Sequence, residues 1–173
     1  MLSFRLPSLL TVIALAVLTP SAIAEKNQAD LSAFKGNFRG KAGVKTATSK
    51  FSGKFRVRGK VSGGNRIANL SAKGSVNARG RNLPVDNDFK FTRTGVVKIK
   101  ELAPGDTHGT KVEGTYTATE NLITFEGDWT LGATKGTIEG TVKVNNKGKL
   151  KLTYKVFVSG NDDPFYIYTY VGS

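Results

Sequence analysis

Apolar or small residues alternate with polar residues along most of the chain after residue 24. In the segment 34–42, the apolar and small positions are Phe34, Gly36, Phe38, Gly40 and Ala42. A period of two residues predicts β-strands with one buried and one solvated face, and segments with a helical period are scarce. The same alternation recurs in the segments 51–61, 70–78, 89–99, 112–118, 123–131, 136–144, 150–158 and 165–171. The pattern therefore predicts roughly nine strands.

Turn-forming residues separate these segments. Gly63-Gly64-Asn65 and Asn145-Asn146-Lys147-Gly148 are typical of tight turns, and Pro104-Gly105-Asp106 marks a wider loop. We expect Asn82-Leu83-Pro84 to interrupt the sheet, because proline cannot donate a ladder hydrogen bond. Short turns favour an all-β, antiparallel up-and-down meander. Closure removes exposed edges, so the predicted fold is a small barrel of about 8–10 strands, lipocalin-like in size.

Glycine recurs on the predicted inner face of these strands, where it permits sharp coiling and close approach of neighbouring backbones. The glycines concerned are Gly36, Gly40, Gly53, Gly59, Gly74, Gly114, Gly127, Gly136 and Gly140. The first of them lies in Lys35-Gly36-Asn37-Phe38, which resembles the Gly-x-Trp start of lipocalins with Phe in place of Trp. The resemblance spans four residues; it agrees with a barrel and identifies no family.

The first 24 residues have the three parts of a secretory signal peptide. Arg5 precedes an apolar run from Leu9 to Leu18, and Ala22-Ile23-Ala24 forms a small-residue end. The run is shorter than the roughly 20 residues of a membrane-spanning helix. Cleavage after Ala24 predicts a secreted or periplasmic protein, with a flexible segment over 25–32 and one barrel domain over 33–173. The chain has no cysteine, so burial rather than disulfides must stabilise it.

Positive charge is concentrated in the first half of the chain. Residues 25–100 contain 18 basic and 4 acidic residues, whereas residues 101–173 contain 7 basic and 9 acidic residues. Many of the basic residues lie on the first four predicted strands, nearly all at outward positions, and we call them the basic wall. Its members are Lys35, Arg39, Lys41, Lys54, Arg56, Arg58, Lys60, Lys73, Arg79, Arg81, Lys90 and Lys98.

Such a wall predicts contact with anionic surfaces or ligands, either polysaccharide or lipid phosphate. Nucleic acid is disfavoured because the Phe residues of these strands point inward rather than outward for base stacking. The alternative is that the charge serves only solubility, by keeping strands from pairing edge to edge.

No catalytic, metal or cofactor motif is recognisable. His108 is the only histidine and cysteine is absent, so the chain cannot assemble a zinc cluster or a Ser-His-Asp triad. We therefore predict a non-enzymatic binding protein without a cofactor. A small outer-membrane barrel with its apolar face toward lipid is the alternative, although its interior would have to house the basic residues. An enzyme with a carboxylate and arginine site is a third reading.

An internal ligand cavity is a further hypothesis. Strict alternation over 89–99 places Arg93 inside the barrel, where its guanidinium could hold a ligand carboxylate or phosphate. A bulge near Thr94-Gly95 would instead turn Arg93 outward. Trp129 and Tyr116 are the other candidate cavity residues.

The last predicted strand is apolar on both faces. Phe165, Ile167 and Val171 share one face. The other face carries Tyr166, Tyr168 and Tyr170, which we expect to lie outside, either over basic residues of the first strand or as an interface to another protein.

Overall fold

The computed structural model describes residues 29–101 and 110–173. Within them, the short 3-10 helix η1 (Ser32–Phe34) precedes ten strands. The strands are β1 (Gly36–Thr46), β2 (Lys50–Ser62), β3 (Ile67–Ala78), β4 (Arg81–Phe91), β5 (Val96–Glu101), β6 (Thr110–Ala118), β7 (Leu122–Leu131), β8 (Thr134–Val144), β9 (Leu150–Val158) and β10 (Tyr166–Gly172). The predicted signal peptide with its cleavage site after Ala24, and His108, lie outside the described residues.

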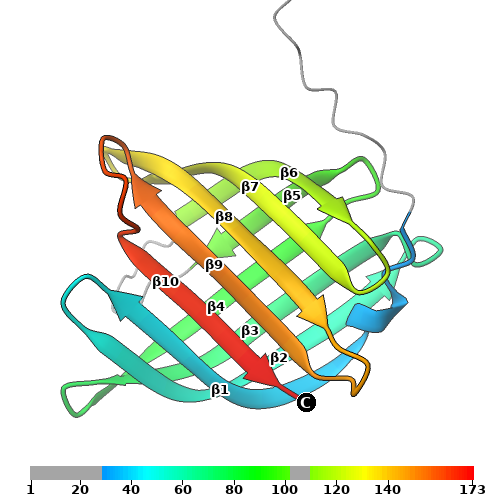
Figure 1. Ribbon diagram of the computed structural model, residues 1–173, viewed down its shortest axis with the longest axis horizontal. Helices are drawn as coiled ribbons and strands as arrows, with labels where there is room; N and C mark the ends of the chain where they lie inside the picture. The colour runs from blue at the N-terminus through cyan, green and yellow to red at the C-terminus, as the bar shows by residue number, and fades with distance from the viewer. Residues whose placement is uncertain (1–28, 102–109) are drawn as a thin grey trace, which may run out of the picture.

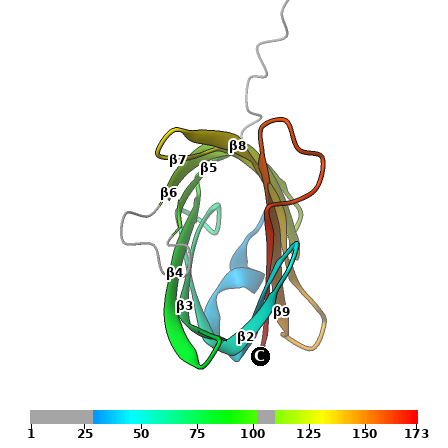
Figure 2. The ribbon, with the colours of Figure 1, turned by 90° about the vertical axis from the view of Figure 1, so that its left-hand side faces the viewer.

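The sheet closes into a barrel, as predicted. Each strand pairs antiparallel with the next along the chain, and β10 returns to pair with β1 (Figures 1 and 2). Alternate residues of each strand face inward and are buried, which gives one core of aliphatic and aromatic side chains. No helix among the described residues has the length and hydropathy needed to cross a membrane.

The segment 89–99, expected to form one strand, belongs to two. β4 ends at Phe91 and β5 begins at Val96, with a tight turn between them. The Thr92 backbone N–H donates to the Val96 carbonyl (2.9 Å), and the Thr92 hydroxyl donates to the same carbonyl (2.9 Å). This turn, rather than a bulge in a continuous strand, ends the alternation.

The predicted interruption at Asn82-Leu83-Pro84 is also wrong, because these residues lie within β4. The turn comes earlier, at Arg79 and Gly80, whose φ angles of 51° and 80° are those of a two-residue hairpin. Pro84 is tolerated in the strand because, among the described residues, its part of β4 pairs with β3 alone.

The residues before β1 are anchored to the barrel. The Leu31 N–H donates to the Asn65 carbonyl in the β2–β3 turn (2.7 Å), and Leu31 and Phe34 are fully buried. Hydrogen bonds from Ser32 and Asn65 lower the pKa of the Asp30 carboxyl. The expectation of a flexible segment over 25–32 is therefore wrong at Leu31.

Gly59 of β2 makes room for η1, because a Cβ at this position would overlap the Phe34 carbonyl. We predict that Gly59→Ala lowers the free energy of unfolding by roughly 1–3 kcal/mol, the usual cost of overpacking, as measured by urea denaturation. Gly43→Ala is the matched control: a Cβ there has only the Phe51 carbonyl oxygen within reach, at 3.8 Å. Equal stability of the two variants would contradict the packing of η1 against β2.

Candidate functional site

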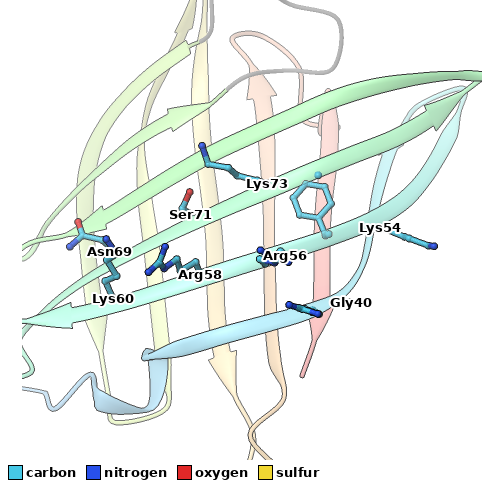
Figure 3. A pocket seen from close by; sticks show the side chains of 11 residues that line it. Gly40, Lys54, Arg56, Arg58, Lys60, Asn69, Ser71 and Lys73 are labelled. Atoms are coloured by element: carbon cyan, nitrogen blue, oxygen red, sulfur yellow. The ribbon is translucent and has the colours of Figure 1, made fainter.

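The outer surface of β1, β2 and β3 holds a groove of about 1080 Å³ (Figure 3). Its floor includes the backbone of two glycines, and six of its eleven lining residues are Lys or Arg. We call this site the basic groove. It is lined by Arg39, Gly40, Lys54, Phe55, Arg56, Arg58, Lys60, Asn69, Ser71, Lys73 and Gly74.

Strand register places cations directly opposite one another in and beside the groove. Arg56 of β2 lies opposite Arg39 on one side and Lys73 on the other, and Lys54 lies opposite Lys41. Directly opposed like charges destabilise a sheet by about 0.2–1 kcal/mol per pair. The segment 31–62, which contains η1, β1 and β2, has no acidic residue that could offset this repulsion.

One groove cation has a carboxylate partner. The Lys73 ammonium group lies 2.8 Å from an Asp86 oxygen, and this hydrogen bond raises the pKa of Lys73. The other five, Arg39, Lys54, Arg56, Arg58 and Lys60, form no ion pair within the described residues. The groove therefore presents largely uncompensated positive charge.

Half of the predicted basic wall lines the groove, and Lys41 lies beside it. Lys90 and Lys98 oppose each other on β4 and β5, where Lys98 forms an ion pair with Glu113 (3.1 Å). The remaining three members lie at the margins: Lys35 between η1 and β1, Arg79 in the β3–β4 turn and Arg81 at the start of β4.

Sequence reasoning missed the cations that closure adds from the second half. Lys41 lies opposite Val171 of β10, Val171 lies opposite Lys151 of β9, and Lys151 lies opposite Lys143 of β8. Alternation alone does not predict that Lys41, Lys151 and Lys143 lie in one line across the sheet, because this line depends on the β1–β10 register.

The cavity hypothesis for Arg93 is wrong, because Arg93 is exposed in the turn between β4 and β5. Trp129 and Tyr116 do point inward and are buried. The Tyr116 hydroxyl donates to the Thr92 carbonyl of the same turn (2.6 Å). The Trp129 indole N–H is buried and has no hydrogen-bond acceptor among the described residues.

The interface hypothesis for Tyr166, Tyr168 and Tyr170 is also wrong. All three are buried inside the barrel, and the rings of Tyr168 and Tyr154 are stacked with centroids 4.8 Å apart. The buried Asn87 amide donates to the Tyr154 hydroxyl (2.6 Å) and to the Tyr170 hydroxyl (2.8 Å). The tyrosines of β10 thus face the interior, and the smaller apolar residues Ile167 and Val171 face outward.

The orientation of the faces is opposite to that of a membrane-spanning barrel. Apolar and aromatic side chains face inward, and the described lysines and arginines of the strands lie on the outer face. A barrel in lipid needs an outward apolar band. This overturns the outer-membrane alternative. His, Cys, Asp and Glu side chains in the described part of the chain form no group of three that could hold a metal ion.

The opposed cations predict an unusual response to salt. Raising NaCl from about 0.01 to 0.1 M shortens the Debye length from roughly 30 to 10 Å, which screens the repulsion. We expect the Tm of the 149-residue chain after Ala24 to rise by a few degrees in calorimetry. An Arg56→Gln variant should show a smaller rise. A Tm that falls with salt would mean that attractive ion pairs dominate this surface.

Comparison with known proteins supports the architecture. No protein-family model matches the sequence, and a search of curated proteins finds no match. The chain is similar to the crystal structure of Rv2717c from M. tuberculosis, with a TM-score of 0.55 and 17% sequence identity. The match covers 82% of this chain and 93% of that chain. At this level of identity, the likeness shows a shared β-barrel fold.

Proposed function

We propose that this protein is a secreted or periplasmic, non-enzymatic binding module that holds anionic groups, such as sulfate, carboxylate or phosphate, in the basic groove. The observation that carries the proposal is the position of Arg56 between Arg39 and Lys73. Neither arginine has a carboxylate partner within the described residues. Anionic oxygens bound between them would replace repulsion with charge-assisted hydrogen bonds.

Solubility alone accounts poorly for this arrangement. A small domain stays soluble with a net charge of about 2–8 and with both signs interspersed. The formal net charge is +13 for the whole sequence and +12 for residues 25–173, and the cations of β1 and β2 are not interspersed with carboxylates. Solubility also has no need for a groove or for opposed cations.

Reversing the charge of Arg56 tests the proposal while keeping the fold. We expect Arg56→Glu to weaken binding to heparin about tenfold or more in calorimetric titration, because a charge-assisted contact is replaced by a repulsive one. The same variant should be more stable than the wild type by about 1 kcal/mol, because Glu would lie opposite both Arg39 and Lys73.

Lys135→Glu makes the same change of charge at an exposed position of β8, outside the groove, and is the matched control. It should keep binding within about twofold of wild type. Equal loss of binding in both variants would show that heparin binding depends on the net charge of the protein and not on the groove. No binding by the wild-type protein at about 0.15 M salt would refute the proposed function.

A small ligand inside the barrel is a second candidate function, favoured by the Trp129 indole N–H. A buried donor without an acceptor is costly, and a mainly apolar ligand with one acceptor oxygen would satisfy it. Trp129 is the only tryptophan, so its fluorescence reports on this site alone. We expect oleate to change its emission saturably, and Trp129→Phe to weaken oleate binding in a competition assay. Unchanged emission up to the solubility limit of oleate would exclude this candidate.

A further inference from the structure

The shape of the basic groove points to one class of ligand. Resting on the proposed function, we propose that the groove holds a single extended chain of an acidic polysaccharide, and that this chain lies along β2. Four of the five outward cations of β2 line the groove, and each would meet one anionic group of the polymer. We call these four, Lys54, Arg56, Arg58 and Lys60, the β2 row.

The β2 row occupies alternate positions along one strand (Figure 3). Alternate residues of a strand are about 6.6 Å apart, so the row extends over about 20 Å from Lys54 to Lys60. A compact anion such as inorganic phosphate can reach no more than two neighbouring members. A linear polymer with a repeating charge can reach all four, which favours a chain over a small ion.

Polar groups beside the row suit a sugar. Ser71 and Asn69 of β3 lie opposite Arg58 and Lys60, and both line the groove. A hydroxyl and an amide both donate and accept hydrogen bonds, as sugar hydroxyls do. The Lys60 end of the groove therefore combines charge recognition with neutral hydrogen bonding, whereas Arg56 has a cation opposite it on both sides.

The groove lacks the features that single-stranded nucleic acid uses. Binders of single strands stack bases on exposed aromatic rings. Phe55 is the one aromatic lining residue, and it is only 6% exposed. Its ring packs edge-on against Tyr170, with centroids 4.6 Å apart. It therefore belongs to the core and offers no platform for a base.

A flat membrane fits this surface less well than a chain does. The backbone of Gly40 and Gly74 forms part of the concave floor, which a planar surface would not reach. The one exposed large apolar side chain of the described residues, Phe165, precedes β10 and lies outside the groove. The cationic groove is therefore not accompanied by an exposed apolar side chain that could insert into lipid.

The first test uses heparin oligosaccharides of increasing, defined length in calorimetric titration with the full mature protein. We expect the affinity to rise with length until the chain spans about 20 Å, and then to change little per site. Lys60→Gln removes one end of the β2 row and should shorten the length at which the plateau begins. Lys41→Gln, beside the row on β1, should leave that length unchanged. Identical plateaus in the two variants would overturn the alignment along β2.

The second test compares three probes of different class at the same salt concentration. Heparin octasaccharide should bind at least tenfold more tightly than a poly-dT oligonucleotide of equal charge, and than phosphatidylglycerol vesicles at equal phosphate concentration. Equal or tighter binding of poly-dT, or of vesicles, would overturn the polysaccharide assignment while leaving the basic groove as an anion site. Binding of none of the three would remove the proposed function as well.

Discussion

The pairing of β1 with β10 is the constraint on which the rest of the molecule depends. Seven residue pairs, from Gly40–Gly172 to Thr46–Tyr166, join the two ends of the sheet. A closed sheet has one interior, so residues of one parity must enter it and residues of the other parity must face solvent. Closure also leaves no exposed edge. The cations of β1 and β2 are therefore not needed to prevent edge-to-edge pairing, which weakens solubility as their sole explanation.

Closure also links the aromatic interior to the basic groove on the outer face. Phe55 lies between Gly40 and Gly74 in register, and its ring contacts Tyr170 inside the barrel. Tyr170 in turn accepts a hydrogen bond from the buried amide of Asn87. The floor of the groove is thus the outer side of a tightly packed core. The strand backbone that carries the cations is therefore fixed by the core before a ligand arrives, so binding has to order only their side chains.

Alternation was sufficient to predict the closed meander, and it placed the cations of β1 and β2 outside. It failed where other features decide the structure. Arg93 was placed inside by continuing the alternation of a strand that in fact ends at Phe91. The last strand is apolar on both faces, so alternation could not tell which of its faces is inside, and therefore on which side Tyr168 lies. The groove itself was beyond prediction, because it depends on register: Arg39 meets Arg56 only once β1 and β2 are aligned. The β1–β2 turn between Lys45 and Lys50 sets that alignment, and its residues 46–49 include no Gly, Pro, Asn or Asp to mark a turn in the sequence.

Opposed like charges occur in both halves of the barrel, but only the β1–β2 pair combines them with a segment, 31–62, that has no acidic residue, and this gives the groove its energetic role. Glu113 and Glu139 each lie about 3 Å from a lysine on a neighbouring strand. The β1–β2 pair instead opposes Arg39 to Arg56, Lys41 to Lys54 and Lys45 to Lys50. Each pair raises the free energy of the folded state, and an anion bound between the strands removes that cost. A ligand that binds only the folded barrel must stabilise it. Binding and stability are thus coupled through the same side chains.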